Sequence, residues 1–149
     1  MSRRALPAVL FAAAVLAMAG PWASAEATGA VTSSFLGSFG LSPAFAEAAN
    51  VVLRKGGHAL AYAVFGVLVW RAVPAGGRPG GRPLVALGAA VVLATADELL
   101  QGLSPSRGSS TFDVLLDAGG ATLGIALAVR CARARARGSG DPEADGPTA

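Results

Sequence analysis

Charged residues divide the chain into four largely apolar blocks. The blocks cover residues 5–25, 56–75, 83–102 and 111–130. A helix needs about 20 mostly apolar residues to cross the hydrocarbon core of a membrane. The pattern therefore predicts an all-α fold, a small transmembrane helical bundle of about four helices.

The first block, residues 1–25, has two interpretations. Arg3 and Arg4 precede an apolar segment, and residues 23–25 read Ala-Ser-Ala, which resembles the small-residue cleavage site of a signal peptide. The block is therefore either the first transmembrane helix or a cleaved signal peptide. Both interpretations place residue 26 outside the cytoplasm.

The basic residues predict which side of the membrane each loop faces. If the chain starts in the cytoplasm and crosses four times, nine of its 12 Lys and Arg residues lie on the cytoplasmic side. Short cytoplasmic loops of membrane proteins carry such an excess of positive charge. We therefore predict that both termini are cytoplasmic. The nine residues are Arg3, Arg4, Arg71, Arg78, Arg82, Arg130, Arg133, Arg135 and Arg137.

The connecting segments differ in character. Residues 26–53 are predicted to be extracytoplasmic, and Phe35 and Phe39 make them too apolar for a free loop. We expect a short amphipathic, partly helical element on the membrane surface there. Residues 54–132 form the predicted core with three transmembrane helices. Residues 133–149 are expected to be a basic and then disordered cytoplasmic tail.

Composition supports a membrane protein and weakens other classes. The 149 residues are 53% hydrophobic and only 14% charged, whereas a soluble domain has about 25% charged residues. The net charge of +3 comes from arginines that flank apolar runs, which indicates topology and not a nucleic-acid partner. One cysteine, Cys131, and one histidine, His58, exclude an internal disulfide and a multi-histidine metal site within one chain. No cofactor and no resident metal are therefore expected.

The remaining polar residues gather at the outer ends of the last three predicted helices. Several have i,i+4 spacing, so that both members of a pair project from one helix face. Ionisable groups at membrane depth usually face a bundle interior or a water-filled cavity. The sequence therefore predicts one outward-facing polar pocket. Its candidate residues are Lys55, His58, Tyr62, Asp97, Glu98, Gln101, Arg107, Ser109, Asp113 and Asp117.

Some of these residues also have a purely structural interpretation. Ser110 and Asp113 have the spacing of a capping box at the start of the fourth helix. Arg107 could simply neutralise a neighbouring carboxylate. Gly120 and Gly124 form a GxxxG motif, which predicts close packing of two helices.

Two stretches of the chain resemble the VanZ-like family of membrane proteins. In the first, a basic residue precedes a spaced His and Tyr, as do Lys55, His58 and Tyr62. In the second, residues 97–124 follow the pattern D-E-x-x-Q, P-x-R and D-x-x-x-N-x-x-G-x-x-x-G, except that residue 117 is Asp where the family often has Asn.

This resemblance covers about residues 50–130 and implies a small multi-pass protein of the bacterial cytoplasmic membrane. A founding member of the family is tied to low-level resistance to teicoplanin, a glycopeptide antibiotic. The resemblance implies no particular reaction, and it does not show that this chain confers resistance.

The first functional hypothesis is a non-catalytic protein of the cell envelope. Its pocket would bind a lipid head group, a cell-wall precursor or a protein partner, and the chain could form homo- or hetero-oligomers in the lipid bilayer. Arg107 and Lys55 would contact an anionic group, since the guanidinium of arginine matches the geometry of phosphate.

The alternative hypotheses are an enzyme and a transporter. A membrane-embedded hydrolase or transferase of envelope lipids would use His58 or Glu98 as general base and Arg107 to stabilise negative charge. Asp97 or Asp113 would orient the base or hold a metal. No established catalytic motif is present, so the sequence leaves catalysis undecided. A transporter would relay protons through the same carboxylates.

Overall fold

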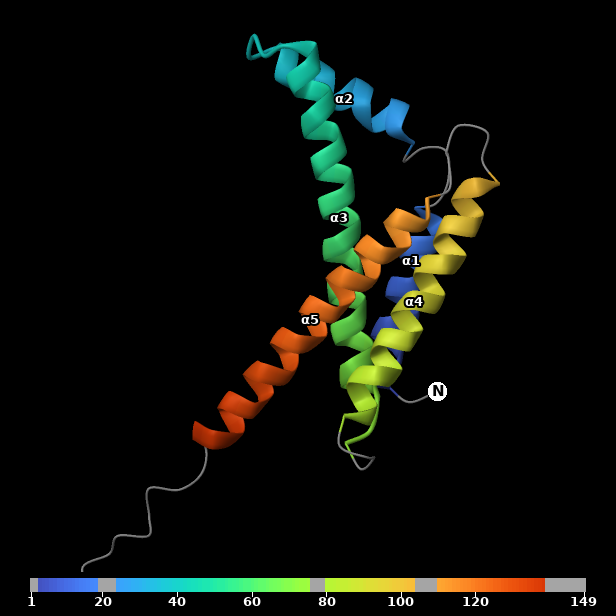
Figure 1. Ribbon diagram of the computed structural model, residues 1–149, viewed down its shortest axis with the longest axis vertical. Coiled ribbons are helices and arrows are strands. Elements are labelled where there is room, and N and C mark those ends of the chain that lie inside the picture. The colour runs from blue at the N-terminus through green and yellow to red at the C-terminus, as the bar shows by residue number, and fades with distance from the viewer. Residues whose placement is uncertain (1–2, 19–23, 76–79, 104–109, 139–149) are drawn as a thin grey trace, which may run out of the picture.

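The computed structural model describes residues 3–18, 24–75, 80–103 and 110–138, and these residues contain helices and turns but no strand. Figure 1 shows long helices that cross one another, with a shorter helix packed beside them. The predicted all-α fold is confirmed. The five helices are α1 (Leu6–Ala17), α2 (Ala25–Gly37), α3 (Pro43–Ala72), α4 (Gly81–Gly102) and α5 (Thr111–Gly138).

Three of these helices, α3, α4 and α5, are long and apolar enough to cross a membrane. The first helix has only 12 residues, so it is about 18 Å long, against about 30 Å for the hydrocarbon core. The predicted count of four spanning helices is therefore not confirmed. Residues 19–23, which would complete the first predicted span, lie outside the described residues.

The helix α3 begins at Pro43, although the apolar pattern predicts a start near residue 56. Ser42 caps it by accepting a hydrogen bond from the backbone N–H of Phe45 at 3.3 Å, and proline suits the first helical turn. Charged residues such as Glu47 and Arg54 then continue the helix, because charge opposes burial in lipid but does not interrupt backbone hydrogen bonds. With 30 residues, α3 is about 45 Å long.

The helix α5 also exceeds its predicted length. It continues to Gly138 and so includes the basic first part of the predicted tail, residues 133–138. These last residues are exposed, and arginine and alanine are among the better helix formers. Local preference therefore sustains the helix beyond its apolar part.

The segment between the first two apolar blocks is partly helical, as predicted. Ser24 caps α2 by accepting a hydrogen bond from the N–H of Ala27 at 3.2 Å. The exposed rings of Phe35 and Phe39 meet edge to face with their centres 5.2 Å apart. The rest of this segment is a turn and the first part of α3.

The core between the helices is made mostly of small side chains. Buried alanines alternate with a few large residues such as Tyr62 and Phe65. The helix α1 contributes to the core through buried Ala8, and Phe11 and Val15 pack against it. Short side chains let the helices approach closely, as is common in membrane bundles.

The closest helix contact is that between α3 and α5. A Cβ added to Gly120 would lie 2.9 Å from the Cα of Ala59, and one added to Gly124 would lie 2.9 Å from the Cα of Ala63. Neither position has room for a side chain. The structure therefore places the GxxxG motif directly against the backbone of α3, just below the polar residues of both helices.

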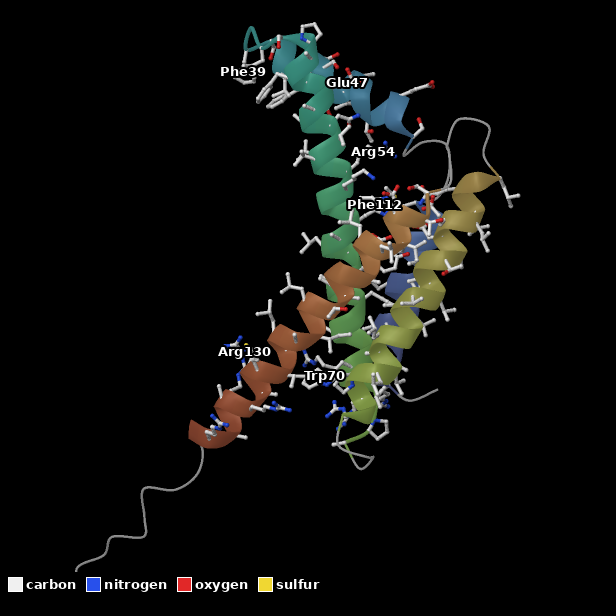
Figure 2. The ribbon with its side chains drawn as sticks, viewed as in Figure 1. Phe39, Glu47, Arg54, Trp70, Phe112 and Arg130 are labelled. Atoms are coloured by element: carbon white, nitrogen blue, oxygen red, sulfur yellow. The ribbon has the colours of Figure 1, made fainter. Side chains whose placement is uncertain are left out.

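The two ends of the bundle differ in charge. The N-terminus, the start of α4 and the end of α5 lie toward one end, called here the arginine end (Figure 1). The helix α2, the end of α4 and the start of α5 lie toward the opposite, acidic end. Figure 2 shows Arg54 and Phe112 toward the acidic end, and Trp70 and Arg130 toward the arginine end.

Candidate functional site

Three polar side chains from three helices meet near the acidic end of the bundle. The Nδ1 of His58 on α3 lies 3.9 Å from Oδ2 of Asp97 on α4 and 3.8 Å from Oδ2 of Asp117 on α5. Asp97 and Asp117 are only 2% and 3% exposed, whereas His58 is partly exposed. We call these three residues the triad.

Helix geometry explains why these residues converge. The contact through Gly120 and Gly124 holds α5 against α3. Asp117 lies about one turn before Gly120 on α5. Residues four apart share a helix face, so His58 and Tyr62 both point inward from α3. Tyr62 is completely buried.

The hydroxyl of Tyr62 faces the carboxylates of the triad, since Asp97 and Asp117 both act on it electrostatically. The Oδ2 of Asp97 accepts a hydrogen bond from the Nε2 of Gln101 at 3.1 Å. By contrast, the Oδ1 of Asp117 makes no hydrogen bond within the described residues. The buried carboxylate of Asp117 therefore has bonding capacity that these residues do not use.

The other predicted site residues form two contacts beside the triad. Lys55 donates a hydrogen bond to Asp113 and forms an ion pair with it. Glu98 accepts a hydrogen bond from the backbone N–H of Ser110, which precedes α5. Asp113 thus pairs with Lys55, and Glu98 takes the N–H that the capping-box interpretation assigns to Asp113.

An apolar cavity of about 370 Å³ opens beside the triad. Its walls come from α1, α3 and the start of α2, and its polar lining consists mainly of Arg54, His58 and Asp97. The apolar wall residues include Phe11, Ala14, Val15, Met18, Leu53, Gly57 and Ala61.

Two further cavities adjoin the first. One of about 500 Å³ lies between α2 and α3 and is lined by Asn50 and Arg54 among others. The other, of about 90 Å³, is lined by Lys55, His58 and Asp113 and also by Arg54. Arg54 therefore borders all three cavities.

Arg54 was not singled out as a site residue by the sequence analysis. In the described parts of the chain no ion pair engages its guanidinium. Its spacing of four residues from His58 places both on one face of α3, and this spacing could have identified it. Among the residues that the structure describes, Arg54 borders these cavities without an ion pair, whereas Lys55 is paired with Asp113.

A family model described as VanZ/LLP1 matches residues 6–132, which is most of the chain. The chain belongs to the VanZ/LLP1 family. The match confirms the resemblance and extends it toward the N-terminus, so that it includes α1 and α2. No curated protein and no solved structure shows significant similarity to the chain.

The motif residues of this VanZ/LLP1 protein fall into groups. The structure brings together His58, Tyr62, Asp97, Gln101 and Asp117, and places the Lys55–Asp113 pair and Glu98 next to them. The predicted Arg107 and Ser109 lie outside the described residues.

The arginine end of this VanZ/LLP1 protein carries a different cavity. Arg4, Arg71 and Arg82 line a space of about 580 Å³. The Nη2 of Arg82 donates a hydrogen bond to the carbonyl of Trp70 at 2.8 Å, and its guanidinium lies 4.7 Å from the centre of the Trp70 ring. A cluster of arginines therefore lies toward the end of the bundle opposite the triad.

Proposed function

We propose that this VanZ/LLP1 protein binds an amphiphile with a phosphate-bearing head group of net negative charge at its acidic end. In this proposal the protein lies in the bacterial cytoplasmic membrane, with the arginine end in the cytoplasm and the acidic end facing outward. The observation that carries the proposal is the apolar cavity of about 370 Å³ whose lining includes Arg54.

The dimensions and lining of this cavity suit an amphiphile. Small-molecule sites usually measure about 300–1,000 Å³ and combine apolar walls with a few polar groups. Here the walls are aliphatic and aromatic, and the polar groups are concentrated near His58 and Arg54. A hydrocarbon chain would contact the walls while its head group remains at the polar part.

The charge of Arg54 favours an anionic head group. Lys55 is engaged by Asp113, whereas Arg54 forms no ion pair in the described residues and borders all three adjoining cavities. A guanidinium forms two parallel hydrogen bonds to phosphate oxygens. Arg54 therefore supports the choice of a phosphate head group with net negative charge over a zwitterionic or neutral head group.

The test is native mass spectrometry of the full chain in detergent with added lipid. We expect one phosphatidylglycerol to bind, and phosphatidylcholine to bind at least about tenfold more weakly. Arg54→Gln removes the charge and should weaken phosphatidylglycerol binding about tenfold, since hydrogen bonds to charged groups contribute roughly 1.5–3 kcal/mol. Undecaprenyl phosphate in a parallel series distinguishes a cell-wall carrier lipid from a membrane phospholipid.

Two neighbouring glycines provide a matched pair of variants. Gly57 lines the cavity, whereas Gly56 does not, and a Cβ at either position would meet open space. We expect Gly57→Phe to block lipid binding and Gly56→Phe to leave it unchanged. Equal affinity for phosphatidylglycerol and phosphatidylcholine, or full binding by Gly57→Phe, would contradict the proposal.

A second candidate function is hydrolysis or transfer of the bound head group. One observation favours it: His58 and Asp97, a possible base and its orienting carboxylate, line the same cavity as Arg54. Incubation of the lipid complex followed by analysis for released head group separates the two functions. Stable lipid without product favours the binding protein.

A further inference from the structure

We propose that His58, Asp97 and Asp117 bind one divalent first-row transition-metal ion. The proposal concerns the triad itself and does not depend on whether an amphiphile occupies the neighbouring cavity. Each residue offers one ligand atom, a nitrogen or a carboxylate oxygen, and these three atoms all lie within 4.8 Å of one another. They come from three different helices, so the tertiary fold brings them together.

The distances are close to those of a metal site. Zinc binds imidazole nitrogen and carboxylate oxygen at about 2.0–2.2 Å, so two ligands in a tetrahedral arrangement are separated by about 3.3–3.6 Å. The Nδ1 of His58 lies 3.8 and 3.9 Å from the two aspartate oxygens. Side-chain movements of a few tenths of an ångström would bring the imidazole nitrogen to this separation from each carboxylate oxygen, and all three atoms already lie within 4.8 Å of one another.

Charge and burial also favour a divalent ion. Asp97 and Asp117 are almost completely buried, and buried carboxylates are costly unless they are paired or bind a metal. Protonated His58 contributes one positive charge, whereas the two carboxylates contribute two negative charges. A divalent cation would balance both carboxylates while the imidazole stays neutral.

An unused polar atom provides a separate observation. Asp117 is almost completely buried, and its Oδ1 makes no hydrogen bond in the described residues. A bound ion or its coordinated water would use this remaining bonding capacity.

The donor set indicates which class of metal fits. One imidazole and two carboxylates are typical of sites for zinc, manganese or iron, whereas magnesium and calcium prefer oxygen ligands alone. His58 and Asp97 also line the apolar cavity. An ion held by the triad would therefore lie at the polar part of that cavity, next to Arg54.

The test uses the full chain with a tag that contains no histidine, stripped of metal with a chelator and titrated with CoCl₂. We expect one Co²⁺ per chain, seen by its visible absorption and by elemental analysis. Asp117→Asn keeps the side-chain shape but removes a charged ligand. It should weaken Co²⁺ binding at least about tenfold, because even the loss of a group that only hydrogen-bonds to a metal ligand lowers metal affinity by about that factor. His58→Gln should abolish the imidazole contribution to the spectrum.

Asp113→Asn is the matched control, because it makes the same change on the same helix one turn away. It should bind Co²⁺ like the original chain. Thermal unfolding with ZnCl₂ provides a second measurement, in which Zn²⁺ raises the melting temperature of the original chain and of Asp113→Asn but not of folded Asp117→Asn. Equal Co²⁺ binding by Asp117→Asn and the original chain, or no binding by either, would overturn the metal site and leave the lipid proposal untouched.

Discussion

At the residue scale, Glu98 and Asp113 illustrate how tertiary contacts redistribute polar roles. The Lys55–Asp113 pair is partly exposed, and ion pairs of this kind contribute about 0–1 kcal/mol. Glu98 is 8% exposed and accepts the N–H of Ser110, and a hydrogen bond to a charged group contributes about 1.5–3 kcal/mol. The contact that joins α4 to the start of α5 is therefore the stronger of the two.

The glycines of α5 support a prediction with an internal control. Alanine normally stabilises a helix by about 0.5–1 kcal/mol relative to glycine. Gly120→Ala and Gly124→Ala should instead destabilise the protein by about 1–3 kcal/mol, because an added Cβ meets the backbone of α3. Gly119→Ala, whose Cβ would meet open space, should be neutral or slightly stabilising. Unfolding titrations in detergent measure all three, and equal stability of Gly120→Ala and Gly119→Ala would refute the close contact.

The sequence predicts part of the site because helix periodicity is local. Spacing of four residues places His58 and Tyr62 on one face of α3, and Asp97 and Gln101 on one face of α4. Because successive spans cross the membrane in opposite directions, both pairs come to the same end of the bundle. The roles of Lys55, Arg54 and Glu98 depend on which neighbours each side chain meets in three dimensions. These pairings involve residues 12 to 58 positions apart, and no local pattern encodes them.

At the scale of elements, apolar length and helix length are different quantities. The apolar blocks locate the parts of α3, α4 and α5 that can lie in lipid, and the predicted end of α4 near residue 102 agrees with the structure. The pattern does not locate the start of α3 or the end of α5, because Glu47 or Arg133 can continue a helix into water. The hydrogen bond accepted by the Ser42 side chain, together with Pro43 in the first turn, sets the true start of α3.

The helix α1 packs against the bundle, and this packing favours the interpretation in which residues 1–25 are retained. Ala8 is buried in the core, and Phe11 and Val15 line the apolar cavity. Cleavage after residue 25 would remove that wall. We therefore predict that the mature protein retains residues 1–25.

Intact mass spectrometry of protein purified through a C-terminal tag measures this directly. The expected mass is that of the uncleaved chain. Ala25→Leu breaks the Ala-Ser-Ala pattern and serves as the control, since it should change the mass only by the substitution. A native chain about 25 residues shorter than the Ala25→Leu chain would show that the segment is a signal peptide.

At the scale of the whole molecule, a cluster of arginines and the triad lie toward opposite ends of the bundle. The guanidinium groups of Arg4, Arg71 and Arg82 surround one cavity, and the triad lies toward the other end. Proteins of the cytoplasmic membrane keep arginine-rich segments inside, so this separation predicts that the acidic end, with the apolar cavity, faces outward. That orientation would give the cavity access to lipids and precursors of the outer leaflet.

Cys131 allows this orientation to be measured with a native residue. It is the single cysteine of the chain, it is exposed, and it follows Arg130 near the arginine end. A membrane-impermeant maleimide should leave it unlabelled in intact spheroplasts and label it once the membrane is permeabilised. In a Cys131→Ser chain that carries Ser33→Cys on the exposed surface of α2, labelling should already occur in intact spheroplasts. The reverse pattern would place the arginines outside and the triad toward the cytoplasm, and the amphiphile would then have to come from the inner leaflet.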